Sequence, residues 1–143
     1  PLDMVLASCQ SVISKISMLA FLDTLYYVWK GGRVLGIAHA ITSILKVKPL
    51  LDLARGEVIT LGRPRTSARA KDSLLELMHQ RIGSARIHAA VMHADVLQEA
   101  EALHDYVEAE FDVAELFISE FSPVMGSHTG PGLLGVAFWT QGA

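Results

Sequence analysis

The sequence has one cysteine, few aromatic side chains and no excess of positive charge. Because Cys9 is the single cysteine, the chain can form neither an intrachain disulfide nor a cysteine-rich zinc site. This suits a reducing compartment, so we expect a cytoplasmic protein. Twelve Lys and Arg against fifteen Asp and Glu give a net charge of −3, which argues against a dedicated nucleic-acid-binding protein. Charged residues make up only 19%, so we expect some apolar surface to face a partner or ligand.

Export and membrane segments are not expected either. Residues 1–6 lack the basic region of a signal peptide, and polar residues at 9–11 interrupt the apolar run. Residues 121–143 contain no Asp, Glu, Lys or Arg and are long enough to suggest a membrane span. Pro123, Pro131 and five glycines within them would leave backbone groups unsatisfied in lipid. We interpret this stretch as a loop followed by a buried strand.

Apolar runs, turn residues and helix caps predict the element order β, α, α, β, β, α, β, α, β, β. A hairpin with a tight turn at 54–56 and two strand–helix–strand crossovers predict an α+β fold in two layers. We expect one sheet of about six strands, mixed or mainly antiparallel, with the helices mostly on one face. The expected strands are 15–22, 50–53, 57–61, 87–92, 116–121 and 133–139; the two shorter helices are 25–30 and 34–45.

Caps and apolar stripes define two longer helices. Thr66 or Ser67 is expected to begin one of them, with Ala70, Leu74, Leu77 and Met78 buried and Gly83 at its end. Asp95 is expected to cap the other, with Gln98 three residues later and a stripe through Val96, Ala100, Leu103 and Val107.

The most unusual segment is the glycine-rich stretch 126–132, Gly-Ser-His-Thr-Gly-Pro-Gly. Its glycines would let consecutive backbone N–H groups face one anion, and Ser127, His128 and Thr129 could add side-chain donors. A glycine-rich connection with a solvated histidine remains the alternative. The spacing Gly130, Gly132, Gly135 matches a dinucleotide fingerprint only by accident, because a strand follows where a helix is needed.

Two arginine segments also stand out. Arg33 follows Lys30-Gly31-Gly32, a helix stop, and could make a bidentate contact with a carboxylate or simply complement the helix dipole. Arg63 and Arg65 precede a helix N-terminus, where basic residues work against the dipole. They are therefore expected to serve an anion or an acidic partner, with a solvated loop as the alternative.

Other chemistries have little support. The sequence contains no His-Glu-x-x-His zinc motif, no Cys/His cluster, no calcium loop and no Gly-x-Ser-x-Gly nucleophile elbow. His88 and His93 are expected to point to opposite faces of one strand, so they cannot share a metal ion. We therefore expect no metal and no cofactor, while Ser/His/Asp chemistry stays open on the residues alone.

Several segments together resemble the C-terminal half of the DegV family of bacterial fatty-acid-binding proteins. The resemblance covers roughly four-fifths of the chain. It rests on the stretches Phe21-Leu22-Asp23-Thr24-Leu25, Lys30-Gly31-Gly32-Arg33-Val34, Leu45 to Leu51 with Lys48-Pro49, Arg65-Thr66 with Ala70, His93-Ala94-Asp95, Ser119-Glu120 and Gly126 to Gly135.

The resemblance implies a lipid-binding module without enzymatic activity, which presents a long-chain fatty acid to a partner kinase. It implies that Arg33 and His128 belong to the polar network around the fatty-acid carboxylate, and that Arg65 faces the ligand head or the kinase. The rest of the implied ligand-binding set is Gly126, Ser127, Thr129 and Gly130. Candidates for the acyl-tunnel wall are Val34, Leu35, Ile37, Ala38 and Ile41.

Family proteins are about twice as long and have two domains, the first of which contributes hydroxyl groups to the head-group site. The resemblance therefore implies that residues 1–14 are a remnant helix or linker and that 15–143 form the C-terminal domain alone. Such a fragment is expected to bind fatty acid weakly or not at all, and to self-associate through the face left by the absent domain. Two alternatives remain open: a small enzyme with His128 as general base and Ser127 or a water as the nucleophile, and a ligand-free protein-interaction domain.

Overall fold

A computed structural model describes residues 1–32, 46–53 and 56–141, and it contains one six-stranded mixed sheet. The strands are β1 (Ser17–Phe21), β2 (Leu50–Asp52), β3 (Ile59–Gly62), β4 (Ile87–His93), β5 (Val113–Glu120) and β6 (Leu134–Thr140). They are arranged in the order β3-β2-β1-β6-β4-β5. Only β4 and β5 run parallel, and every other neighbouring pair is antiparallel. The predicted α+β class and strand count are confirmed.

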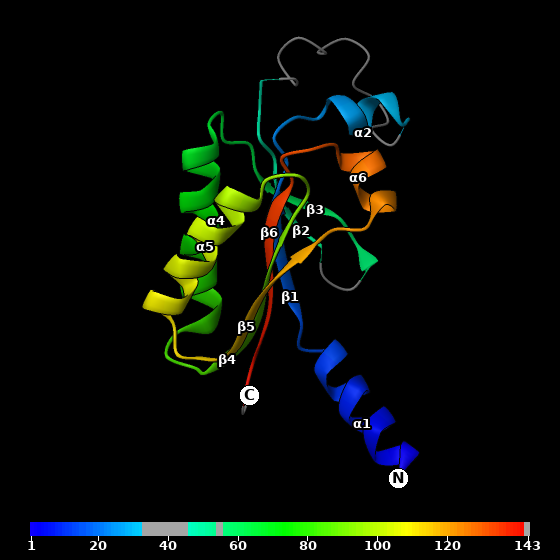
Figure 1. The fold of residues 1–143 in the computed structure, drawn as a ribbon, viewed down its shortest axis with the longest axis vertical. Helices are drawn as coiled ribbons and strands as arrows, with labels where there is room; N and C mark the ends of the chain where they lie inside the picture. The colour runs from blue at the N-terminus through cyan, green and yellow to red at the C-terminus, as the bar shows by residue number, and fades with distance from the viewer. Residues whose placement is uncertain (33–45, 54–55, 142–143) are drawn as a thin grey trace.

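Two helices, α4 (Ser67–Ile82) and α5 (Leu97–Glu110), cover one face of the sheet (Figure 1). α4 contacts β1 and β2, while α5 contacts β4 and β5. Alternate residues of β4 are buried beneath them because side chains alternate across a strand. The predicted α4 stripe is buried at Ala70, Leu74 and Met78 and packed against the core at Leu77, and Leu103 and Val107 of α5 are buried as expected.

Two short helices, α2 (Tyr26–Lys30) and α6 (Pro123–Thr129), lie on the other side of the sheet, beyond one end of the strands (Figure 1). They close a second, smaller apolar cluster whose buried members come from β1, β2 and the loops next to β1, β4 and β6. Leu25, Val28 and Met125 pack against it from the two helices and their flanks. The buried members are Ala20, Leu22, Leu51, Ala94 and Leu133.

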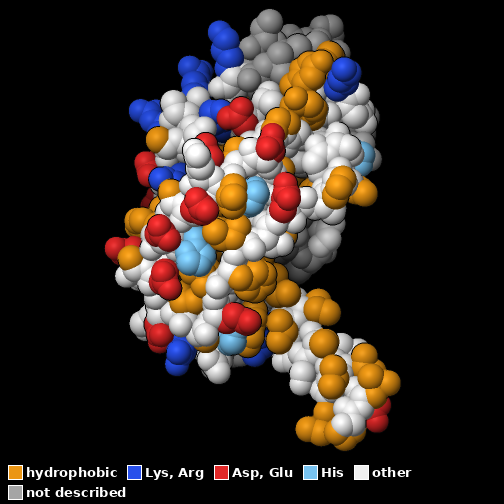
Figure 2. All heavy atoms as spheres, in the orientation of Figure 1, with side chains coloured by type: hydrophobic (Ala, Val, Ile, Leu, Met, Phe, Trp, Pro, Cys, Tyr) orange, Lys and Arg blue, Asp and Glu red, His pale blue; other side chains and the backbone are white. Residues whose placement is uncertain are grey.

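The N-terminal helix α1 (Leu2–Ile13) has no buried residue and projects from the body of the domain (Figure 1). Figure 2 shows apolar side chains over much of its surface. Its exposed large hydrophobic residues are Leu2, Met4, Val5, Leu6 and Ile13. A 12-residue helix is marginal in water without packing, so this surface is suited to a partner.

Helix α5 differs from the prediction at its start. Its N-cap is Val96, and the Val96 N–H donates to Nδ1 of the buried His93 at 3.4 Å. Asp95 instead has a φ of 57°, in the left-handed region that Asp tolerates better than most residues. The prediction that Asp95 caps this helix is therefore wrong, because the N-cap is Val96 and the helix has no side-chain cap hydrogen bond within the described residues.

Thr66 caps α4 as predicted, accepting a hydrogen bond from the Arg69 N–H at 3.3 Å, and Gly83 ends the helix. The predicted turn at 54–56 falls mostly outside the described residues, although β2 and β3 do pair antiparallel. The predicted helix at 34–45 also lies outside them.

None of the described helices combines the length and apolarity needed to cross a membrane. The cytoplasmic location stays a prediction.

Candidate functional site

The glycine-rich stretch is not an open loop, because its first four residues form the last turn of α6. The Ser122 hydroxyl accepts a hydrogen bond from the Met125 N–H at 3.5 Å, and Pro123 occupies the first helical turn, where its missing N–H has no cost. The predicted connection between two strands therefore contains a helix that apolar periodicity did not reveal, since it is only seven residues long.

The expectation that consecutive backbone N–H groups here face one anion is wrong. The N–H of Gly126 donates to the Ser122 carbonyl at 3.0 Å, and that of Gly130 donates to the Gly126 carbonyl at 2.8 Å. The N–H of Gly132 donates to the Ala94 carbonyl at 2.8 Å. These donors are used to close the helix and to fix the following turn to the end of β4.

The hydroxyl groups of α6 are also engaged by the helix itself. Ser127 Oγ donates to the Val124 carbonyl at 2.8 Å, and Thr129 Oγ1 donates to the Met125 carbonyl at 2.9 Å. His128, half-buried in the last turn, makes no ring hydrogen bond within the described part of the chain. Among the predicted side-chain donors on α6, the imidazole is therefore the one whose N–H is available to a ligand.

Helix α2 packs directly against α6. A Cβ atom at Gly130 would overlap the ring of Tyr27, and a Cβ at Gly132 would lie 2.5 Å from the Cβ of Asp23. Both glycines also have positive φ, 75° and 88°, so both the available space and the backbone conformation exclude a side chain at these positions. The segment that leads into Arg33 is thereby held beside the helix that carries His128.

Arg33 lies outside the described residues, as do the tunnel-wall candidates Val34, Leu35, Ile37, Ala38 and Ile41. The structure thus places the end of α2 and the two glycines Gly31 and Gly32 that follow it. Arg65 is described, and it is exposed in the turn before α4. Its neighbour Pro64 accepts a backbone hydrogen bond from the Lys48 N–H at 2.7 Å.

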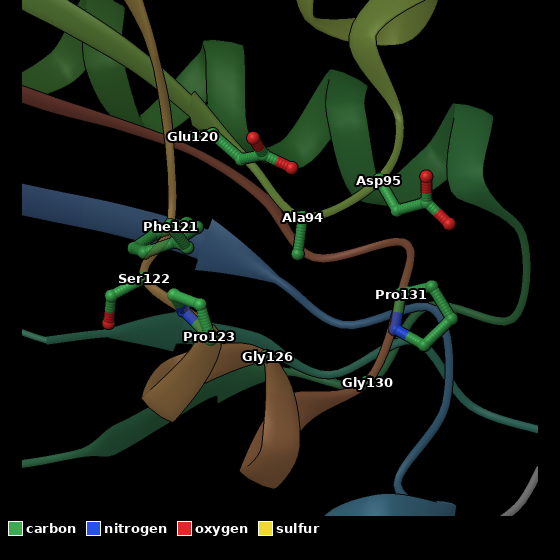
Figure 3. Close-up of a pocket in the computed structure, with 9 residues that line it drawn as sticks. All are labelled: Ala94, Asp95, Glu120, Phe121, Ser122, Pro123, Gly126, Gly130 and Pro131. Carbon is green, nitrogen blue, oxygen red and sulfur yellow. The ribbon is translucent and has the colours of Figure 1, made fainter.

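A pocket of about 390 Å³ opens between α6 and the ends of β4 and β5 (Figure 3). Gly126 and Gly130 of the predicted ligand-binding set contribute to its wall, whereas His128 does not. Two exposed carboxylates at its rim, Asp95 and Glu120, were not predicted as site residues. Their motifs, His93-Ala94-Asp95 and Ser119-Glu120, are among those that resemble the DegV family, and this is the sequence signal that could have found them. The remaining lining residues are Ala94, Phe121, Ser122, Pro123 and Pro131.

One group of described side chains could in principle hold a metal ion. His104, Asp105 and Glu108 lie on α5 with ligand atoms within 4.8 Å of one another. Both carboxylates are exposed, and exposed acidic groups commonly lie this close without an ion. The group carries no functional argument by itself.

Comparison with known proteins identifies the family. The DegV family profile, described as one of uncharacterised proteins, matches residues 1–141. A DegV domain-containing protein of Streptomyces coelicolor is 42% identical over 118 residues, which cover 81% of this chain and 42% of that protein. Protein DegV of Bacillus subtilis is 31% identical over 117 residues, again 81% of this chain and 42% of that protein. The chain spans about half the length of the curated relatives it matches.

Solved structures share the fold over nearly the whole chain. A DegV family protein of Thermus thermophilus, whose structure is described as fatty-acid-binding, superposes with a TM-score of 0.80 at 29% identity. The match covers 99% of this chain and 51% of that protein. The Bacillus subtilis DegV structure, described as a fatty-acid-binding protein, gives a TM-score of 0.78 at 26% identity, with 97% and 50% coverage.

Proposed function

The chain belongs to the DegV family, and we propose that it is a fatty-acid-binding module in which His128 and Arg33 bind the carboxylate. The observation that carries this proposal is the packing of α2 against α6. It brings the segment that precedes Arg33 next to the helix that carries His128, above the smaller apolar cluster. The relatives of known structure that are described as fatty-acid-binding support it.

The chemistry of a fatty acid fits this arrangement. A carboxylate that leaves water needs charge-assisted donors, and an imidazole and a guanidinium supply them. The acyl tail needs an apolar wall, and each buried methylene contributes about 0.8 kcal/mol. The tail would thus provide most of the affinity, while the two cationic groups orient the head. We propose Val34, Leu35, Ile37, Ala38 and Ile41 as the wall.

We propose further that these 143 residues hold only part of the fatty-acid site. Its relatives are about twice as long, so the remaining contacts would come from the other half of such a protein. The module would then present its fatty acid to a partner kinase, which would perform the chemistry. The exposed Arg65 would face the ligand head or that kinase. Binding by the 143 residues alone would be weak.

A titration of the chain with decanoate, a water-soluble fatty acid, followed by NMR of the histidine rings, tests this proposal. We expect saturable shifts of the His128 signals with weak affinity. His128→Ala is expected to weaken binding about tenfold, as the loss of a hydrogen bond to a charged group does. His104→Ala on α5 is the matched control and should leave the affinity unchanged.

A double-mutant cycle with Arg33→Met and His128→Ala then tests whether both side chains bind the same carboxylate. Side chains that share one ligand group give non-additive losses. Fully additive losses in the double-mutant cycle would contradict the shared site. In the titration, the absence of a saturable shift at millimolar decanoate would contradict the fatty-acid module and favour a ligand-free interaction domain. Tight stoichiometric retention of fatty acid by the monomer in native mass spectrometry would overturn the incomplete site.

The enzymatic alternative gains no support from the geometry of α6. The hydroxyl of Ser127, a candidate nucleophile, donates a hydrogen bond to the Val124 carbonyl. Adjacent residues on a helix do not face each other, so Ser127 and His128 are poorly placed to act as nucleophile and base. Retained lipid binding with loss of a measurable turnover in His128→Ala would support catalysis instead.

A further inference from the structure

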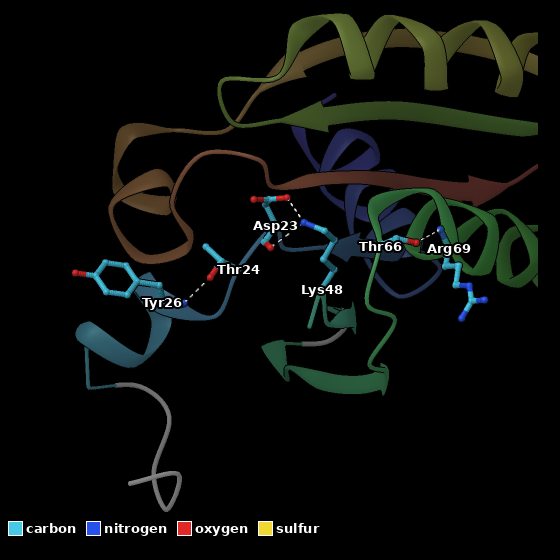
Figure 4. Close-up of polar contacts among 6 residues, drawn as sticks. All are labelled: Asp23, Thr24, Tyr26, Lys48, Thr66 and Arg69. Carbon is cyan, nitrogen blue, oxygen red and sulfur yellow. Dashed lines mark hydrogen bonds and ion pairs between the residues drawn. The ribbon is translucent and has the colours of Figure 1, made fainter. Parts of the chain in front are cut away.

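Three segments that are far apart in the sequence meet at Lys48, through its side chain and its backbone N–H. Its ammonium group donates to the Asp23 backbone carbonyl at 3.1 Å and forms an ion pair with the Asp23 carboxylate. Its own backbone N–H donates to the Pro64 carbonyl at 2.7 Å. Figure 4 shows Lys48 between Asp23 and Thr66, at the start of α4. Lys48 therefore joins the turn that contains Arg65 to the turn that begins α2.

Asp23, held by Lys48, in turn contacts the turn that follows α6. Its Cβ fills the space next to Gly132, where any side chain on the glycine would collide with it. Gly132 in turn is anchored to the end of β4 by its hydrogen bond to Ala94. The turn after α6 is thus held between β4 on one side and Asp23 on the other.

The same residue also sets the start of α2. Asp23 precedes Thr24, whose hydroxyl accepts a hydrogen bond from the Tyr26 N–H at 3.1 Å, and Tyr27 then packs on Gly130. A shift of Asp23 would therefore move α2 relative to α6 and change the distance between the end of α2 and His128. Lys48 is the cation that holds Asp23 in place, with its side chain only 19% exposed.

We propose that Lys48 is a positioning residue for the carboxylate site: through Asp23 it holds α2 against α6 and so sets where His128 lies relative to the end of α2. This inference rests on the proposed function for its effect on ligand affinity. Lys48 would not touch the ligand. Its contribution would be the rigidity of the frame that carries the donors, which binding sites need to within about 0.5 Å.

The test compares Lys48→Met, which keeps the stem and removes the charge, with Lys48→Arg, which keeps a donor for both Asp23 oxygens. Arg81→Met is the matched control. Arg81 forms an ion pair with Asp52 at 2.7 Å, in which the aspartate is less exposed than Asp23, but this pair joins α4 to β2 rather than α2 to α6. Urea unfolding of all three variants shows whether the two ion pairs contribute similarly to stability.

We expect Lys48→Met to shift the ring signals of His128 in the ligand-free protein. We expect it to weaken decanoate binding about tenfold, because a displaced His128 would lose its aligned hydrogen bond to the carboxylate, and one hydrogen bond to a charged group contributes about that factor. Lys48→Arg should keep both the His128 ring signals and the decanoate affinity close to those of the wild type. Arg81→Met should leave both unchanged at a temperature well below its unfolding transition. Unchanged His128 signals in Lys48→Met, or an Arg81→Met effect of equal size on them, would overturn the positioning role.

The ligand-free NMR comparison separates the two proposals. If the wild-type chain does not bind decanoate but Lys48→Met still shifts the His128 ring signals, the proposed function fails while the positioning role stands. If decanoate binds with equal affinity to wild type and Lys48→Met, the positioning role fails while the proposed function stands.

Discussion

The ring of Tyr27 occupies the space that any side chain at residue 130 would need. This contact joins α2 and α6, two helices of five and seven residues that neither length nor propensity would stabilise alone. It also explains why the residue that ends α6 is a glycine with a φ of 75°. The packing of the two helices is therefore the part of the structure on which the proposed site depends most directly.

Gly130→Ala is expected to destabilise the protein by about 2–4 kcal/mol, because the added methyl group meets Tyr27 and the positive φ disfavours alanine. Gly126→Ala on the same helix is the control. A Cβ at Gly126 meets nothing within 4 Å, so this change should be neutral or stabilise by up to about 1 kcal/mol. Urea unfolding measures both, and equal effects would contradict the close packing of α2 on α6.

Thr66→Ala is expected to lower the free energy of unfolding by about 1 kcal/mol, because the hydroxyl accepts the hydrogen bond that caps α4. Ser67→Ala, at the first residue of the same helix, tests whether the effect is specific to the cap. Thermal unfolding followed by circular dichroism provides the comparison. A larger loss for Ser67→Ala would mean that the helix begins one residue later in solution.

Leu103→Ala is expected to cost about 2–5 kcal/mol of stability, since Leu103 is fully buried between α5 and the sheet and its loss leaves a cavity. Leu97→Ala on the same helix removes the same atoms from a side chain that is 52% exposed, and should change stability by less than about 0.5 kcal/mol. Chemical denaturation of both variants checks which face of α5 meets the sheet.

Self-association through α1 is a prediction that follows from its uncovered apolar surface. Leu6→Glu should shift a concentration-dependent equilibrium toward monomer, because it places a charge in that surface. Ser8→Glu adds the same charge to the same helix without removing an apolar side chain, so it should have a smaller effect. Sedimentation velocity at several concentrations measures both. A wild-type chain that stays monomeric at high concentration would contradict the prediction.

Sequence patterns predicted well those elements that pack one face, or most of their side chains, against the core. The strand at 87–93 was predicted at 87–92 because it is rich in apolar residues, and the helix that Thr66 caps was predicted because apolar residues recur every three or four positions along it. The start of α5 was misplaced because capping rules favour Asp before an apolar run, whereas Asp95 has a positive φ and the N-cap is Val96, one residue later. Helix α6 was missed because seven residues with a central glycine carry no periodic signal.

The sequence by itself determined the fold class, the six strands, the two long helices and the family, because each of these is encoded in local periodicity, in caps or in contiguous motifs. The tertiary structure alone decided how the motif segments meet. It showed that the glycine-rich stretch closes a helix instead of opening a cradle of N–H groups, and that Asp23 links Lys48 to Gly132. The physical reason is that contacts between residues 23, 48 and 132 depend on strand order and on steric fit, which no local pattern in the chain records.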